Sequence, residues 1–360
     1  MSSSATETSH TAALQSAMAL PFVSIITPCY NEHRTIGLLL EGIYRQSYPR
    51  TAMEVVIADG GSTDATLEFI HAFQSRHPDL AIRVVPNPQR ITPAALNRAI
   101  AAARGEILIR LDAHAIPARD YVARCVEALE QGLGDNVGGV WEIRPGDDSW
   151  IARAIAVAAS HPLAVGDAHY RRAPETARSV DTVPFGAFRR ALFDRIGLFN
   201  ERLPINQDYE LNARIRRHGG VVWLDPAIRS VYMRPTLGAL ARQYWRYGFW
   251  KARMLTHYPT TLRWRQAVPP LFVAGLLGLA ISAPCAKAAR RMLAALIGLY
   301  GGALGAAGAH AAVGRRDPAL SAGLPLAIAT MHFCWGSGFL WSVWSLLAER
   351  RSSEQVVQTR

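Results

Sequence analysis

Asp112-Ala113-His114 is the stretch whose residue types point most directly to chemistry. It follows a short, mostly apolar run, residues 107–111, which has the length of a buried strand. Because residues two apart in an extended segment point to the same side, the carboxylate and the imidazole would face one point. An oxygen and a nitrogen ligand with open positions suit Mn²⁺, or Mg²⁺ if the histidine stays outside the first coordination shell. The alternative is an aspartate that caps the next helix and a histidine that only packs.

Two other polar loops follow apolar, β-branched runs in the same way. Pro28-Cys-Tyr-Asn-Glu32 comes after residues 22–27, and Asp59-Gly-Gly-Ser-Thr-Asp64 comes after residues 54–58. Neither loop has the G-x-G-x-x-G spacing of a dinucleotide site. Three polar loops at three strand ends predict one shared site if the strands are parallel neighbours, because ligands gather at the carboxyl ends of such strands.

The surrounding pattern alternates strands with helices. Strands are predicted at residues 22–27, 54–58, 82–85, 107–111 and 137–141. Four helices are predicted between them: one that begins at Ile36, one that ends at about Arg76, and two at residues 93–103 and 119–131. This alternation predicts an α/β fold with a largely parallel sheet covered on both faces. Residues 161–178 have no clear period and many charges, and we expect them to form a loop that could act as a lid.

Asp208 is a second candidate for chemistry in the N-terminal part of the chain. It lies at the start of a short helical pattern, where the helix macrodipole stabilises a carboxylate. The alternative is an acid that only favours the helix start. Its distance from the three strand-end loops cannot be derived from the sequence.

The C-terminal third is of a different kind. Residues 236–255 form a basic, aromatic amphipathic helix, which fits a membrane interface or packing on the N-terminal domain. Three apolar stretches follow, residues 267–286, 292–313 and 322–348, each long enough to span a bilayer. The glycines at 275, 278, 301, 302 and 305 would allow close helix contacts. The basic residues between the stretches do not fit one simple topology, so two or three spans are predicted.

Composition agrees with a membrane-bound protein that handles anions. Hydrophobic residues make up 50% of the chain and charged residues 19%, with a formal net charge of +11. Much of the basic charge is near the apolar stretches, where anionic lipid explains it more simply than nucleic acid does. The four cysteines form no C-x-x-C pair, which argues against a disulfide framework or a zinc site. Residues 1–20 lack a signal-peptide pattern and are expected to be a disordered tail.

These motifs resemble those of the family 2 glycosyltransferases with the GT-A fold, in particular the succinoglycan biosynthesis enzymes. The resemblance covers roughly residues 21–248. It is carried by Ser24-Ile-Ile-Thr-Pro-Cys-Tyr-Asn-Glu32, Asp59-Gly-Gly-Ser-Thr-Asp64, Leu96-Asn-Arg-Ala-Ile100, Asp112-Ala-His114, Val183-Pro-Phe-Gly-Ala-Phe-Arg189 and Asn206-Gln-Asp208.

The resemblance implies a role for each matching residue. Asp112 would hold the metal, Mn²⁺ or Mg²⁺, with His114 in the place of the second aspartate of the family's D-x-D motif. Asp208 would be the catalytic base, and Gln207 replaces the acid that precedes it in the family. Gly186 would lie in the acceptor loop. The nucleotide would be bound by Pro28, Tyr30, Glu32 and, at the base, Asp59.

The predicted function is a membrane-bound, inverting transfer of a hexose from a UDP-sugar to a lipid-linked saccharide. Gln243-Tyr-Trp-Arg-Tyr247 resembles the Q-x-x-R-W motif of processive synthases, with Tyr in place of Trp, so a processive synthase is one alternative. A catalytically silent, nucleotide-binding membrane subunit is another. The predicted order is a tail (1–20), a GT-A domain (21–235), an interfacial helix region (236–266), transmembrane helices (267–348) and a tail (349–360). The catalytic domain is expected on the cytoplasmic side of the plasma membrane.

Overall fold

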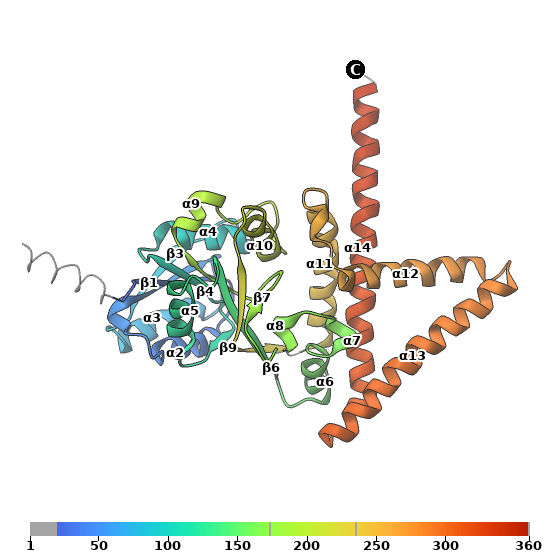
Figure 1. Cartoon of the computed structure of the whole chain (residues 1–360), viewed down its shortest axis with the longest axis horizontal. Coiled ribbons are helices and arrows are strands. Elements are labelled where there is room, and N and C mark those ends of the chain that lie inside the picture. Colours follow the sequence, from blue (N-terminus) through green and yellow to red (C-terminus); the bar gives the residue numbers. More distant parts are fainter. Residues whose placement is uncertain (1–19, 173, 235, 359–360) are drawn as a thin grey trace, which may run out of the picture.

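The structure is a computed structural model that describes residues 20–172, 174–234 and 236–358. Nearly all of the tail predicted at the N-terminus, and the last two residues of the one predicted at the C-terminus, lie outside these residues. The described chain has two parts, an N-terminal α/β domain and a C-terminal group of long helices (Figure 1).

A nine-stranded mixed sheet forms the centre of the α/β domain. The strand order is β3-β2-β1-β4-β8-β6-β9-β5, with β7 paired to β9. Neighbouring strands within β3-β2-β1-β4 are parallel to each other, and so are β6 and β9. Strand β8 is antiparallel to both of its neighbours, β4 and β6. The strands are β1 (Val23–Cys29), β2 (Met53–Asp59), β3 (Ala81–Pro86), β4 (Ile107–Arg110), β5 (Ala115–Pro117), β6 (Asn136–Pro145), β7 (Arg178–Ser179), β8 (Ala187–Arg189) and β9 (Val222–Arg234).

Helices cover both faces of this sheet, as the buried strand pattern requires. Val23 and Ile25 of β1 pack into one core, whereas Ile26 packs into the other, because successive side chains alternate between faces. The first core includes α2 (Ile36–Tyr44), α3 (Thr66–Arg76) and α5 (Tyr121–Glu130). The second includes α4 (Thr92–Ala102), α9 (Ala191–Ile196) and α10 (Gln207–Arg217). The predicted α/β fold with a mostly parallel sheet is confirmed.

The segment predicted as a loop, residues 161–178, contains two short helices in the structure. They are α7 (Pro162–Val165) and α8 (His169–Arg172), and they follow α6 (Trp150–Ala158). Pro162 occupies the first turn of α7, and the side chain of His161 accepts a hydrogen bond from the Leu163 amide. One-turn helices are too short to produce a hydrophobic period, which explains why the sequence pattern did not indicate them.

Four long helices make up the C-terminal part: α11 (Leu237–Leu255), α12 (Trp264–Ser282), α13 (Lys287–Arg315) and α14 (Leu320–Gln358). In Figure 1, α12 leads away from the α/β domain and α13 returns to the start of α14. Within the described residues, three helices are long and apolar enough to cross a membrane: Trp264–Ser282, Lys287–Arg315 and Leu320–Glu349. Leu271 and Leu299 are 70% and 75% exposed, which an apolar lipid surrounding would explain.

Glycines bring α11 and α14 into close contact, but they are different glycines from those predicted. A Cβ atom on Gly248 of α11 would lie 2.1 Å from the Trp335 carbonyl oxygen, and one on Gly338 of α14 would lie 2.2 Å from the Trp245 carbonyl oxygen. A Cβ atom on any of the predicted glycines, 275, 278, 301, 302 and 305, would meet nothing within 4 Å. The prediction for those five was therefore wrong, because which glycine faces a partner depends on where the helices cross.

We expect Gly248→Ala to destabilise the protein by about 3 kcal/mol, because the new methyl group must push α11 away from the α14 backbone. Thermal unfolding of the full chain in detergent measures this. The matched control is Gly275→Ala, at an open position in α12, which should unfold at the wild-type temperature or slightly above it because alanine favours helix. Equal unfolding temperatures for both variants would contradict the packing described here.

Candidate active site

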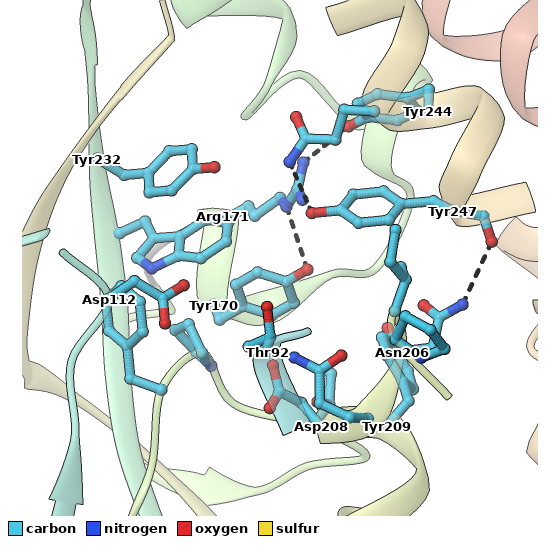
Figure 2. Close-up of a pocket in the computed structure, with 18 of the residues that line it drawn as sticks. Thr92, Asp112, Tyr170, Arg171, Asn206, Asp208, Tyr209, Tyr232, Tyr244 and Tyr247 are labelled. Carbon is cyan, nitrogen blue, oxygen red and sulfur yellow. Dashed lines mark hydrogen bonds between the residues drawn. The ribbon is translucent and has the colours of Figure 1, made fainter. Parts of the chain in front are cut away.

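A cavity of about 420 Å³ opens beside the carboxyl ends of β1 and β4, where the sequence predicted the site. Six of the predicted site residues line it: Pro28, Tyr30, Glu32, Asp112, His114 and Asp208. Asp59 and Gly186 do not line the cavity. Asp59 is paired in the sheet with a residue that does, and Gly186 directly follows one in the chain. Figure 2 shows Asp112 and Asp208 among the side chains around this space.

The loops after β1 and β2 are tied to each other by hydrogen bonds. The Asn31 amide donates to Ser62 Oγ at 2.9 Å, and the Thr63 amide donates to Asn31 Oδ1 at 2.8 Å. The Glu32 amide donates to Thr66 Oγ1 at 2.8 Å. These bonds hold together two loops that follow neighbouring parallel strands, at one edge of the cavity.

Asp59 shapes its own loop. Its carboxylate accepts hydrogen bonds from the amides of Gly61 and Ser62 at 2.8 and 2.9 Å and from Ser62 Oγ at 2.6 Å. A carboxylate has about four acceptor positions, so one remains for a ligand. Its predicted contact with a nucleotide base therefore stays a prediction. Gly186 has a φ of +102°, which favours glycine, and its carbonyl accepts the Arg110 amide at 2.9 Å.

Glu32 links the first loop to His114. Glu32 Oε1 is 3.2 Å from His114 Nδ1, and Glu32 Oε2 accepts from Thr35 Oγ1 at 2.6 Å. Burial lowers the pKa of His114, but the hydrogen bond to Glu32 and the charge interactions with Tyr232, Asp112 and Glu32 together raise it to about 9. Because only a neutral imidazole can bind a metal, His114 would have to lose a proton to act as a ligand.

Arg110 connects the two acids that the sequence assigned to the metal and to the base. Its Nε and Nη2 lie 3.0 and 2.9 Å from Asp112 Oδ1, and its Nη1 donates to Asp208 Oδ1. The Arg110 side chain is 4% exposed, so both acids share one buried cation. Burial raises the pKa of Asp208 to about 6, although Arg110 acts in the opposite direction. A carboxylate with a pKa near neutral suits a general base.

The donor set at Asp112 fits a divalent cation that is completed by a substrate. The described residues contain no group of three or more histidine, cysteine, aspartate or glutamate side chains arranged around a metal. Mg²⁺ and similar hard cations are commonly held by one or two carboxylates together with substrate phosphates and water. Both contacts that Arg110 makes with the Asp112 carboxylate go to Oδ1. Asp112 Oδ2 is therefore the oxygen that we expect to bind a cation.

Uncommon backbone conformations gather around the cavity. Asn31, Arg90, Phe185 and Asn206 have φ values of 55°, 55°, 62° and 66°. Three of them, Arg90, Phe185 and Asn206, line the cavity. Positive φ is uncommon outside glycine and clusters at functional sites, where the surrounding structure holds it in place. This observation is independent of the motifs and indicates the same location.

The sequence did not assign a role to Arg110 or to Arg171, which also lines the cavity. For Arg110 a signal was present, because a charged residue in an apolar strand two positions before an aspartate needs a buried partner. No sequence signal indicated that α12 and α14 would contribute Gln266, Pro269 and Trp335 to the cavity wall.

Comparisons with known proteins agree with the resemblance that the sequence motifs indicate. The family described as "Glycosyl transferase family 2" matches residues 24–197. The "Succinoglycan biosynthesis protein ExoA" of Rhizobium meliloti (strain 1021) is 32% identical over 325 residues, which covers 88% of this chain and 93% of that protein. A second relative is the "Dolichyl N-acetyl-alpha-D-glucosaminyl phosphate 3-beta-D-2,3-diacetamido-2,3-dideoxy-beta-D-glucuronosyltransferase" of Methanococcus voltae. It is 30% identical over 241 residues, 65% of this chain and 74% of that protein.

Among solved structures, the mannosyltransferase PcManGT of Pyrobaculum calidifontis, in complex with GDP-Man and Mn²⁺, has a TM-score of 0.58 and 26% sequence identity. The match covers 87% of this chain and 88% of that one. It therefore extends beyond the α/β domain into the C-terminal helices.

Proposed function

Because the chain belongs to glycosyl transferase family 2 and is a glycosyltransferase with the GT-A fold, we propose that it transfers a hexose from a UDP-sugar to a lipid-linked saccharide, with inversion. The reaction would serve the synthesis of exopolysaccharide or another cell-surface glycan. One observation carries this proposal: a single cavity joins the strand-end carboxylates to α12 and α14, two of the helices that are long and apolar enough to cross a membrane.

The nucleotide would occupy the end of the cavity lined by Pro28, Tyr30 and Glu32. Tyr30 is 44% exposed, and the Arg90 guanidinium lies 5.6 Å from the centre of its ring. An exposed aromatic ring with a cation over it offers both a stacking surface for a base and a positive charge for a phosphate. Asp59 would accept a hydrogen bond from the base through its remaining acceptor position.

The transfer itself would take place between Asp112 and Asp208. A divalent cation, Mn²⁺ or Mg²⁺, held by Asp112 would offset the negative charge that develops on the leaving diphosphate. Asp208 would take the proton of the acceptor hydroxyl as that oxygen attacks the anomeric carbon. A single displacement inverts that carbon, so an α-linked donor gives a β-linked product and no carboxylate nucleophile is needed. Arg110 would hold Asp208 and Asp112 on the same side of the cavity.

The membrane helices would bring the acceptor to this site. We propose, from the basic residues ahead of α12, that the catalytic domain lies on the cytoplasmic side of the plasma membrane. Arg246, in the segment that resembles the processive motif, is exposed and does not line the cavity, in contrast to Gln243 and Tyr247. This placement favours single additions over processive synthesis.

The full chain, purified in detergent, should release a nucleoside diphosphate when it is given Mn²⁺, a lipid-linked saccharide extract and the correct nucleotide sugar. A panel of UDP-sugars is the first choice. GDP-sugars belong in the same panel because GDP-Man is bound in the PcManGT structure. Product length on a gel separates single additions from polymer. Nucleotide binding without release across all donors and acceptors would contradict the proposal and favour the silent subunit.

A further inference from the structure

Arg171, in the short helix α8, is buried beside the cavity, and no acidic side chain in the described part of the chain pairs with it. Its exposed fraction is 7%, and it lines the cavity. Among the described residues, no carboxylate lies within ion-pair distance of its guanidinium group. Arginine keeps its charge in proteins, and a buried charge without a counter-ion is unfavourable. A positive charge is thus retained at this point of the cavity wall, and no carboxylate of the described residues pairs with it.

Aromatic side chains surround this guanidinium group. Its Nε donates to Tyr170 Oη at 3.2 Å, and its Nη1 donates to Tyr244 Oη at 2.8 Å. The group also lies over the rings of Trp141 and Tyr170, at 5.3 and 5.4 Å from their centres. These contacts fix its orientation and compensate part of the desolvation, but they add no negative charge.

The groups that remain available here are hydrogen-bond donors. A guanidinium group has five N–H donors, and within the described residues the bonds of Arg171 start from Nε and Nη1 only. Nη2 is therefore left to donate. A phenol oxygen that accepts a bond from arginine keeps its own O–H to donate, which applies to Tyr170 and Tyr244. Donors without matching acceptors, around one fixed cation, are what an oxyanion requires.

The position of Arg171 indicates which oxyanion. In Figure 2 it lies near the centre of the view, with Tyr244 of α11 above it and Asp208 at the bottom. The same cavity continues to Pro269 of α12 and Trp335 of α14. A lipid-linked saccharide that places its sugar at Asp208 and its lipid at α12 and α14 must pass its charged linker between them.

We propose that Arg171, Tyr170 and Tyr244 form a subsite for the phosphate or diphosphate linker of the lipid-bound acceptor. The proposal rests on the proposed function, because it assumes that a lipid-linked acceptor enters this cavity. The same chemistry could serve the diphosphate of the nucleotide sugar, and the test below separates these two sources.

The test is the binding of farnesyl diphosphate to the full chain in detergent, measured by calorimetry with Mn²⁺ and saturating UDP or GDP present. Arg171→Gln should weaken this binding roughly 10- to 100-fold, the value of a hydrogen-bonded charge. Uncharged farnesol should bind equally to both proteins. The matched control is Arg172→Gln, an exposed neighbour outside the cavity, which should bind farnesyl diphosphate as the wild type does. Tyr244→Phe, which keeps the ring, should weaken binding by a smaller factor and serves if Arg171→Gln does not fold.

Three results would overturn the proposal. The first is unchanged binding of farnesyl diphosphate to both Arg171→Gln and Tyr244→Phe. The second is weaker binding of UDP or GDP to Arg171→Gln with the binding of farnesyl diphosphate unchanged. That result would show that the Arg171 guanidinium group binds the diphosphate of the nucleotide sugar instead. The third is inorganic pyrophosphate binding as tightly as farnesyl diphosphate. None of these measurements needs turnover. If these binding tests fail while sugar transfer is observed, only the subsite proposal is wrong. If sugar transfer itself is not observed, the proposed function is wrong.

Discussion

Asp208→Asn is expected to lower kcat by roughly 10²- to 10⁴-fold, the usual contribution of a general base. The amide keeps the shape of the side chain but cannot take the proton of the acceptor hydroxyl. Binding of the nucleotide sugar should change little, because Asp208 would act on the acceptor side. Initial rates of nucleoside diphosphate release, with acceptor at saturation, measure the effect.

The pH profile provides a second readout of the same assignment. The pKa of Asp208 is about 6, and the ionised form is the active one, so wild-type kcat/KM should fall about tenfold per pH unit below that value. Asp208→Asn should lack this acidic limb. Asp194→Asn, an exposed aspartate on α9 outside the cavity, is the matched control and should behave as the wild type. Near-wild-type turnover by Asp208→Asn would show that another group is the base.

Asp112→Asn is expected to remove most of the response to Mn²⁺. Metal stabilisation of a leaving group is worth several kcal/mol, so kcat/KM should fall by roughly 10²-fold or more. The Mn²⁺ concentration that gives half-maximal activity should rise as well, because an amide is a weaker ligand than a carboxylate. A titration of activity with Mn²⁺ measures both quantities.

The control for this variant is Asp120→Asn, which removes a half-exposed carboxylate that pairs with Arg124 on the surface of α5. It should keep the wild-type response to metal. The assignment of Asp112 would be contradicted if Asp112→Asn required no more Mn²⁺ than the wild type. Loss of activity in Asp112→Asn with an unchanged metal requirement would instead point to disturbed pairing with Arg110.

Much of the α/β domain could be predicted because its signals are local. The four strands from β1 to β4 and the helices α2, α3 and α4 follow from apolar runs and helical spacing alone. Their parallel order then places the loops after β1, β2 and β4 at one edge, which is how Glu32 and Asp112 come to share a cavity. The short helices α7 and α8 carry no comparable signal.

The parts of the site that were not predicted depend on contacts between distant residues. Arg110 and Asp208 are 98 positions apart, and Arg171 and Tyr244 are 73 positions apart. A sequence shows that a buried arginine needs partners, but it does not name them. For the same reason the helix contacts at Gly248 and Gly338 were missed, since they are fixed by the crossing of α11 and α14.

The most direct test of this account is an anomalous difference map from crystals of the full chain grown with Mn²⁺ and a nucleoside diphosphate, UDP or GDP. We expect one strong manganese peak bonded to the carboxylate of Asp112, with the diphosphate on its other side and the nucleoside against Tyr30. A manganese ion and nucleotide bound away from Asp112 and Asp208 would contradict the central claim, that these acids form one site for metal-assisted sugar transfer.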